Sequence, residues 1–183
     1  MMITKITSFS SIPLFQKALY VFDIDDTVMG YKEFSHTYFG DKINEYKKTY
    51  DEHVSIDFAI SDWMEQVKKS TPHHMDKEGF ESILKHINSS DSNHFFLTAR
   101  NPNFRSITEK HLEQLNIRST QVYYVAGQNK GTYLKNIIEK FGKFDKIIFI
   151  DDSEKNLIDM KNSFGKNVEL YHFIKKFELC NFY

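Results

Sequence analysis

Mainly apolar runs alternate with segments of helical periodicity along most of this chain. The apolar runs cover residues 18–22, 94–97, 121–125, 146–150 and 168–174. Short runs that lack a polar face are typical of strands covered on both sides, as in a parallel sheet. The alternation of strand and helix therefore predicts an α/β fold, in which a parallel β-sheet lies between two layers of helices.

Residues that favour helix ends place several of the helix boundaries. A helix is expected to begin after Asp76, and Asn101 followed by Pro102 provides an N-cap and a first helical residue for another. Two later helices are expected to end at Gly142 and Gly165, because glycine readily adopts the backbone conformation that closes a helix.

Residues 28–75 are the least regular part of the chain. We predict that they form a flap and about two helices, as a small, mainly helical insert after the first strand. One helix of the insert is expected to begin near Ser61 or slightly earlier and to bury the side chains that fall at helical spacing, which are Ile60, Trp63, Met64 and Val67.

Pro72 is expected to end this segment and to leave His73 and His74 in a linker. Adjacent histidines rarely present both rings to one metal ion, so the pair does not indicate a metal site. Several aromatic side chains of the insert are expected to pack in the core, with stacking on a substrate as the alternative: Tyr31, Phe34, Tyr38 and Trp63.

The whole chain, residues 1–183, is predicted to form a single domain. Residues 1–17 are expected to pack on it as one helical face or as a loose wrap, through Ile3, Ile6 and Phe9. Residues 175–183 are expected to form a tail that folds back on the core through Phe177, Leu179 and Phe182.

Composition gives no indication of a nucleic-acid or membrane partner. The formal net charge is −1, and no long block of either sign occurs. Cys180 is the single cysteine, so the chain cannot form an internal disulfide and a reducing compartment is expected. No apolar run reaches the length of about 18 residues that a membrane span needs, so a cytoplasmic protein is expected. The few arginines, Arg100, Arg105 and Arg118, suggest no function, and the oligomeric state is not indicated.

Acidic residues follow the first strand directly. Asp23, Asp25 and Asp26 lie within four residues, where aspartate could also serve only as a turn or helix-cap residue. Carboxylates so close together repel one another, and a bound cation commonly offsets that repulsion. Ligands of parallel sheets bind outside the carboxyl ends of the strands, so these acids are expected at the entrance of a site.

The later strands bring further polar residues to the same edge of the sheet. Thr98 follows the second strand, Lys130 lies in the loop after the third, and Asp151 with Asp152 follows the fourth. Four carboxylates, a hydroxyl and an ammonium suit Mg²⁺ together with a phosphoryl group. Neither a thiolate nor a histidine cluster is present in the pattern, so Zn²⁺ is not expected.

These motifs, in this order, resemble the haloacid dehalogenase (HAD) superfamily of phosphohydrolases. They are VFDIDDTV, FFLTARN, NKGTYL and IIFIDDSEKN, within residues 18 to about 164. The strings are also similar to a branch of the superfamily with FDIDNT, LTAR, KG and FIDD motifs, from which this chain departs by having Asp26 where Asn is usual. The resemblance implies a three-layer, Rossmann-like, HAD-like fold in which residues 28–75 are a small cap-like insert.

The resemblance also implies roles for the acids. Asp23 would be the nucleophile that forms an aspartyl phosphate, and Asp25 would be the general acid and base. Mg²⁺ would be bound by Asp23, Asp151 and the backbone carbonyl of Asp25, and Asp152 would bind the cation through water or the ammonium of Lys130. A second acid at Asp25 is typical of phosphatases, because a leaving halide needs no proton.

Supporting roles follow from the same resemblance. Thr98 and Lys130 would bind the phosphoryl oxygens, and Thr27 would orient Asp25 by a hydrogen bond. Asp26 would take no part in the reaction, and Asn156 would either support the site or be an amide on a helix surface. The expected activity is Mg²⁺-dependent phosphomonoester hydrolysis on a phosphorylated substrate whose class the sequence does not indicate.

Two other classes of protein fit part of the pattern. A phosphate-accepting receiver domain of signalling proteins also combines aspartates, a threonine and a lysine on a parallel sheet, but in a different order along the chain. The other alternative is a binding or structural module that keeps the fold without catalysis. Turnover of a generic phosphomonoester would separate both from a phosphatase.

Overall fold

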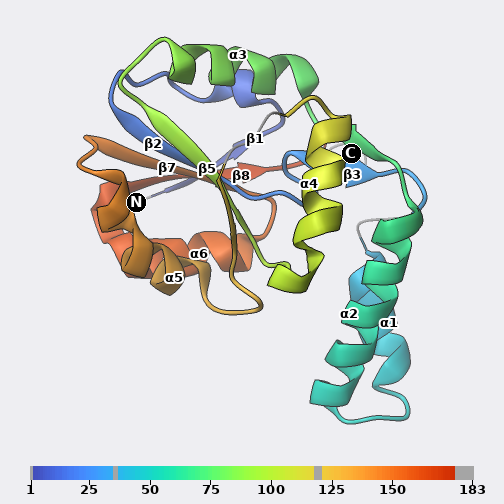
Figure 1. The fold of residues 1–183 in the computed structure, drawn as a ribbon. Coiled ribbons are helices and arrows are strands. Elements are labelled where there is room, and N and C mark those ends of the chain that lie inside the picture. The colour runs from blue at the N-terminus through green and yellow to red at the C-terminus, as the bar shows by residue number, and fades with distance from the viewer. Residues whose placement is uncertain (1, 35–36, 118–120, 176–183) are drawn as a thin grey trace, which may run out of the picture.

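The computed structural model describes residues 2–34, 37–117 and 121–175, and its central element is a parallel β-sheet (Figure 1). In the described part of the chain, six strands pair in the spatial order β1-β8-β7-β2-β5-β6, and every neighbouring pair is parallel. The strands are β1 (Ile3–Ile6), β2 (Ala18–Phe22), β5 (Asn93–Thr98), β6 (Val122–Tyr124), β7 (Lys146–Asp151) and β8 (Val168–Phe173). The predicted α/β fold is confirmed.

Helices cover both faces of this sheet, and the strand β2 lies in its interior. Side chains alternate between the faces of a strand, so Tyr20 and Phe22 pack toward one layer while Leu19 and Val21 pack toward the other. The first layer contains α3 (Lys77–Asn88) and α4 (Arg105–Gln114), and the second contains α5 (Lys130–Ile137) and α6 (Glu154–Phe164) (Figure 1). All of β2 is buried, which explains its continuous apolar sequence.

Short 3₁₀ segments extend or connect these elements: η1 (Phe9–Ser11), η2 (Pro102–Phe104), η3 (Ile138–Phe141) and η4 (Gly165–Asn167). Asn101 accepts a hydrogen bond from the Asn103 amide at 3.0 Å, so the predicted helix start is found, with a 3₁₀ turn first. Gly142 and Gly165 have positive φ angles of 85° and 56°, in agreement with their predicted position at helix ends.

The N-terminal segment differs from its prediction, because residues 3–6 form a strand and not a helical face. β1 pairs with β8 as an edge strand, and only Ile6 of its side chains is buried, so the apolar pattern was too weak to identify it. The segment is then attached to α3 through Asp76, whose carboxylate accepts hydrogen bonds from the Ser8 hydroxyl at 2.7 Å and the Phe9 amide at 2.8 Å. Asp76 is also the predicted N-cap of α3.

The insert consists of two helices on a small two-stranded base. β3 (Met29–Tyr31) pairs antiparallel with β4 (Pro72–His74), and α1 (Tyr38–Tyr46) and α2 (Glu52–Lys69) form a hairpin that extends away from the sheet (Figure 1). His73 and His74 therefore lie in a strand and not in a linker as predicted. The Nε2 atom of His74 is 2.9 Å from the Leu115 carbonyl oxygen.

The boundary and the buried face of α2 also differ from the prediction. The helix begins at Glu52, well before Ser61, because Asp51 caps it by accepting a hydrogen bond from the Val54 amide at 3.0 Å. Ile60 is 39% exposed, although Met64 and Val67 are buried as predicted. The buried stripe continues toward the N-terminus through small residues, Ser55 and Ala59, which carry little hydrophobic signal.

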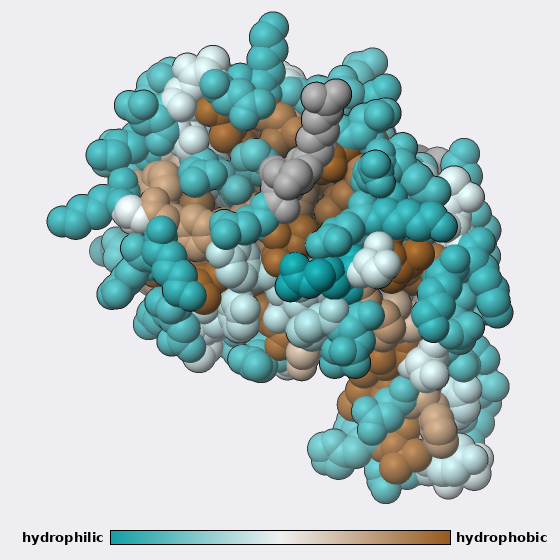
Figure 2. Space-filling model, viewed as in Figure 1, coloured by the Kyte–Doolittle hydropathy of each residue, from teal (hydrophilic) through white to brown (hydrophobic). Residues whose placement is uncertain are grey.

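Apolar atoms are also visible on the surface of the helical hairpin (Figure 2). Phe58, at 42% exposed, and Ile60 belong to this hairpin. Among the described residues, no helix combines the length and the apolar character needed to span a membrane. Phe177, Leu179 and Phe182, which were predicted to pack on the core, lie outside the described residues, and so does Cys180.

Candidate active site

The carboxyl ends of three adjacent strands bring the predicted site residues together. β2 lies between β5 and β7, and these strands end at or next to Asp23, Thr98 and Asp151. The Asp23 amide donates a hydrogen bond to the Ile150 carbonyl at 2.9 Å, which keeps the backbone of Asp23 beside β7. The topology therefore places side chains that are far apart in the sequence at one edge of the sheet.

Lys130 is the buried cation of this edge. Its ammonium donates a hydrogen bond to one carboxylate oxygen of Asp23 and another, at 2.8 Å, to Asp151. The side chain of Lys130 is only 1% exposed. The contact joins the ends of β2 and β7 through a residue of α5.

Close packing of α5 on α6 positions this lysine. A Cβ atom at Gly131 would lie 2.3 Å from the Ser163 hydroxyl oxygen and 2.5 Å from the Asp159 carbonyl oxygen, so no side chain fits there. Asn129 caps the helix by accepting a hydrogen bond from the Thr132 amide at 2.8 Å. The sequence Asn-Lys-Gly thus starts α5 at the point where its first residue reaches both carboxylates.

The pKa values at this contact reflect burial and charge together. Burial raises the pKa of Asp23 to about 7, with further upward contributions from the Asp151 and Asp25 carboxylates, while the Lys130 ammonium counteracts this shift. Burial lowers the pKa of Lys130, but the Asp151 and Asp23 carboxylates outweigh it and hold the pKa above its ordinary value. Lys130 is therefore a permanent cation in this site at neutral pH.

Thr27 orients Asp23, and not Asp25 as predicted. Its hydroxyl donates a hydrogen bond to Asp23 at 3.2 Å and accepts one from the Asp152 amide at 2.9 Å. The turn after β2 is tight, since the Val28 and Met29 amides both donate to the Ile24 carbonyl at 3.0 Å, and it returns Thr27 to the side of Asp23.

Asn156 contacts Asp151 and so is not simply a surface amide. Its side-chain amide nitrogen lies 3.1 Å from each oxygen of the Asp151 carboxylate. The backbone amide of Ser153, at the start of α6, also donates a hydrogen bond to the Asp151 carboxylate, at 2.8 Å. Together with Lys130, these donors keep the fully buried Asp151 in one orientation.

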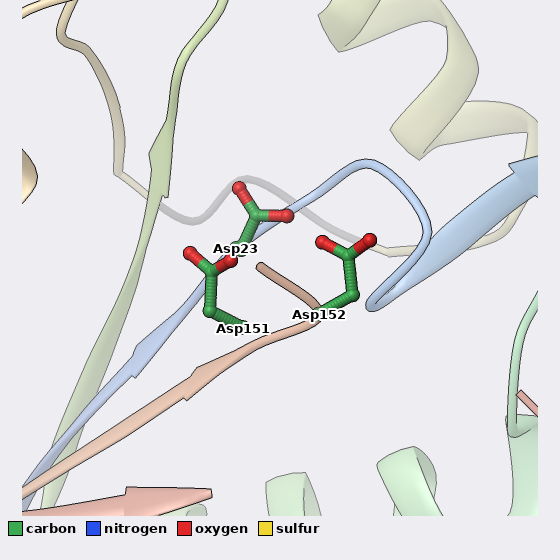
Figure 3. A group of neighbouring side chains, drawn as sticks. All are labelled: Asp23, Asp151 and Asp152. Atoms are coloured by element: carbon green, nitrogen blue, oxygen red, sulfur yellow. The ribbon is translucent and has the colours of Figure 1, made fainter. Parts of the chain in front are cut away.

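Three carboxylates of this edge form a group that suits a metal ion (Figure 3). One oxygen from each of Asp23, Asp151 and Asp152 lies within 4.8 Å of the others. Burial, followed by the charges of Asp23 and Asp151, raises the pKa of Asp152 to about 9, so the group carries unfavourable repulsion. An all-oxygen donor set with this charge fits Mg²⁺, although Asp152 belongs to the group more directly than the sequence indicated.

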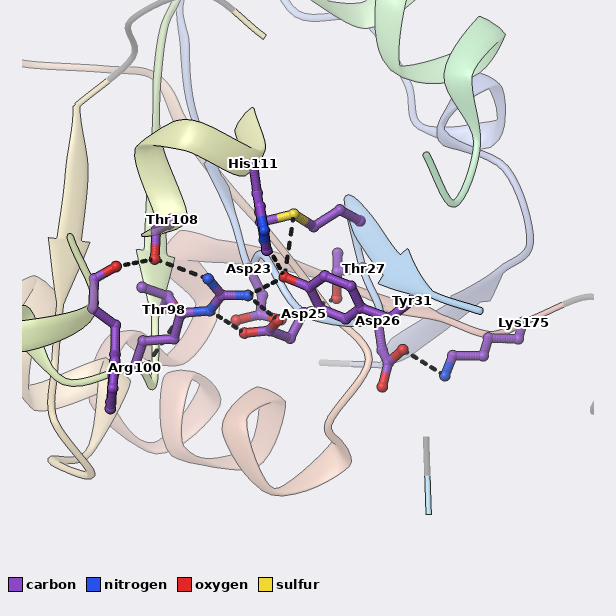
Figure 4. Close-up of polar contacts among 12 residues, drawn as sticks. Asp23, Asp25, Asp26, Thr27, Tyr31, Thr98, Arg100, Thr108, His111 and Lys175 are labelled. Atoms are coloured by element: carbon purple, nitrogen blue, oxygen red, sulfur yellow. Dashed lines mark hydrogen bonds and ion pairs between the residues drawn. The ribbon is translucent and has the colours of Figure 1, made fainter. Parts of the chain in front are cut away.

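Asp25 forms an ion pair with Arg100 (Figure 4). Arg100 Nε donates to one carboxylate oxygen of Asp25 at 2.9 Å, and Nη2 donates to the other at 2.6 Å. No function was predicted for Arg100. The available signal was its position two residues after Thr98, at the carboxyl end of β5.

Residues of the insert and of α4 surround the Arg100 guanidinium (Figure 4). Nη1 donates to the Thr108 hydroxyl at 2.8 Å, Nη2 donates to the Tyr31 hydroxyl at 2.8 Å, and the guanidinium carbon lies 5.3 Å from the centre of the Trp63 ring. Burial raises the pKa of Tyr31 to about 12, so its hydroxyl stays protonated. The aromatic residues of the insert thus have partners within the protein, including the stacked rings of Tyr31 and Phe34 at 5.2 Å.

His111 completes this network as a neutral side chain. Burial, followed by the charge of Arg100, lowers its pKa to about 4. Its Nδ1 atom lies 2.9 Å from the Tyr31 hydroxyl, which accepts from Arg100 and can therefore donate to the unprotonated nitrogen. His111 is a buried residue of α4.

Thr98 and Asp26 occupy different surroundings. Thr98 is fully buried beside the site, and its hydroxyl oxygen accepts a hydrogen bond from the Arg100 amide at 3.2 Å. Asp26 has a φ angle of 59°, a conformation that Asp and Asn tolerate better than most residues, and its carboxylate lies 2.7 Å from the Lys175 ammonium. Asp26 therefore forms an ion pair with the C-terminal part of the described chain.

Comparison with known proteins gives a family but no activity. A family model described as "Protein of unknown function (DUF2608)" matches residues 3–122 and 119–175 of the chain. A search of curated proteins found no match.

We predict that divalent cations stabilise the protein more at high pH than at low pH. An acid whose pKa rises on folding makes its full contribution to stability below the pKa that it has in the unfolded chain, here near 3.8. That contribution is lost as the pH rises through the pKa that the acid has in the folded protein. Without divalent cations, the contributions of Asp23 and Asp152 should therefore decline between about pH 4 and pH 9. Bound Mg²⁺ would offset the repulsion that causes the decline.

Urea unfolding at pH 5 and pH 8, each with Mg²⁺ or EDTA, measures this effect. The gain in free energy of unfolding from Mg²⁺ should be larger at pH 8, and it should shrink in the variant Asp152→Asn. An equal gain at both pH values, or none, would contradict a cation site made by these carboxylates.

Proposed function

Since the chain belongs to the DUF2608 family, whose description assigns no activity, we propose from the chemistry of the site that the protein is a Mg²⁺-dependent phosphomonoester hydrolase. The observation that carries the proposal is the separation of two acids that lie two residues apart. Asp23 is buried against Lys130, whereas Asp25 is 26% exposed and held by Arg100. Two carboxyl groups in different environments are suited to different roles in one reaction.

Asp23 is the nucleophile in the first half of the reaction. One of its carboxylate oxygens attacks phosphorus in line with the leaving oxygen, which forms an aspartyl phosphate and breaks the ester bond. Asp25 donates its proton to the leaving oxygen, so the product is an alcohol and Asp25 becomes a carboxylate. Lys130, which contacts Asp23, and Thr98, at the carboxyl end of the neighbouring strand β5, would donate hydrogen bonds to the phosphoryl oxygens.

Hydrolysis of the aspartyl phosphate completes the cycle. Water attacks phosphorus, its proton passes to Asp25, and the bond between phosphorus and the Asp23 oxygen breaks to release inorganic phosphate. Asp23 is regenerated as a carboxylate and Asp25 as an acid. Mg²⁺ held by the carboxylates of Asp23, Asp151 and Asp152 would supply positive charge to offset the charge of the phosphoryl group.

The resemblance to HAD phosphohydrolases supports the same assignment. The four motifs occur in the expected order, and the residues that they contribute lie at one edge of a parallel sheet. Lys130 and Asp151 contact Asp23 or each other directly, which a set of unrelated turn and cap residues would not require. A phosphatase explains why a lysine is buried here between two acids.

The substitution Asp23→Asn tests the nucleophile. The amide is a poor nucleophile and cannot form the aspartyl phosphate, so kcat for p-nitrophenyl phosphate with Mg²⁺ should fall by at least about 10³-fold. Circular dichroism should show that the fold is kept. Turnover that survives in a folded Asp23→Asn protein would contradict the mechanism.

A pair of neighbouring substitutions tests the acid and base. Asp25→Asn removes the group that transfers protons and should lower kcat by about 10²–10⁴-fold. The matched control Asp26→Asn keeps the size of the side chain and tolerates the positive φ angle, so its kcat should stay within a few-fold of the wild type. Similar losses in both variants would show that the two acids were assigned wrongly.

A further inference from the structure

Arg100 forms an ion pair with Asp25, the proposed acid and base, but has no part in the mechanism described above. Building on the proposed function, we propose that Arg100 is a positioning residue, which holds the Asp25 carboxylate as the base for hydrolysis of the aspartyl phosphate. The guanidinium is held by protein partners, it binds both oxygens of Asp25, and it limits the rotation that the Asp25 side chain would otherwise have.

The hydrogen-bonding groups of Arg100 are committed to protein partners. Of the five N–H groups of a guanidinium, four donate to Asp25, Tyr31 and Thr108. One face of the group lies over the Trp63 ring, and the side chain is 1% exposed. The guanidinium is thus almost fully enclosed by the protein, so Arg100 acts through Asp25 and not on the substrate.

The contact with Asp25 is bidentate. Two parallel N–H groups of Arg100 donate to the two carboxylate oxygens, which fixes the plane of the Asp25 carboxyl group. In the proposed cycle, Asp25 is a carboxylate after it has given its proton to the leaving group. This is the state in which it must accept a proton from water, so the ion pair suits the second half of the reaction.

Asp25 needs a partner that fixes its orientation. It lies in the turn after β2, and its side chain is 26% exposed, whereas Asp23 is held by Lys130 and Thr27. A catalytic group that can rotate spends little time in the reactive geometry, and a displacement of about 1 Å can lower a rate by about 10²-fold. Arg100 is itself fixed from α4, β3 and α2, so it transmits the position of these elements to Asp25.

Pre-steady-state kinetics of Arg100→Gln with p-nitrophenyl phosphate and Mg²⁺ test this role. Nitrophenolate leaves without much help from an acid, so kcat/KM reports formation of the aspartyl phosphate and should stay within a few-fold of the wild type. Steady-state kcat should fall by about 10²-fold, because hydrolysis of the intermediate needs the base. A burst of nitrophenol close to one per enzyme should appear.

Controls separate this role from loss of structure. Arg105→Gln removes an exposed arginine of α4 and should leave kcat, kcat/KM and the burst unchanged. Arg100→Lys keeps the charge but not the paired N–H groups, so it should restore only part of kcat. If Arg100→Gln does not fold, Tyr31→Phe, which removes one contact of Arg100, should show a smaller loss in kcat with kcat/KM kept.

The outcomes distinguish this inference from the proposed function. A parallel fall of kcat and kcat/KM, or no change in either, in the folded Arg100 variants or in Tyr31→Phe would overturn the positioning role and leave the phosphatase proposal standing. Absence of turnover in the wild-type protein with Mg²⁺ and a range of phosphomonoesters would overturn both.

Discussion

The buried ammonium of Lys130 is the charge on which the candidate site depends. Asp23 and Asp151 lie at the ends of adjacent strands, where two buried carboxylates without a cation between them would repel each other. Lys130 reaches both because Gly131 lets α5 approach α6 closely. Packing on one face of the sheet therefore determines the electrostatics at its carboxyl edge.

Each acid of the first motif has a cation from a different part of the chain. Asp23 pairs with Lys130 of α5, Asp25 with Arg100 beyond β5, and Asp26 with Lys175 beyond β8. These three acids of one short segment therefore have different cationic partners. The proposed nucleophile is linked to the sheet and the proposed acid and base to the insert, which gives the insert a means of influencing the reaction.

The sheet and most of the site followed from local patterns, whereas the pairing of side chains did not. Apolar strands that end in acids identify Asp23 and Asp151 because burial and sequence order are local features. The partners of Thr27 and Arg100 depend on the direction of the turn after β2, which the sequence does not indicate. The start of α2 was placed too late because small buried residues such as Ala59 give little hydrophobic signal.

The most direct test of the account is to look for a phosphoryl group on Asp23. Wild-type protein would be mixed with a radiolabelled phosphomonoester and Mg²⁺ and quenched in acid within the first turnover, and the label retained on the protein would be counted. A parallel sample would be reduced with borohydride, which releases the phosphate and converts an aspartyl phosphate to homoserine, and then digested and analysed by mass spectrometry. We predict that label is bound to the unreduced protein and is lost on treatment with hydroxylamine, that homoserine appears at position 23 after reduction, and that both are absent from Asp23→Asn. Hydrolysis without any labelled protein, or label on another residue, would contradict the central claim.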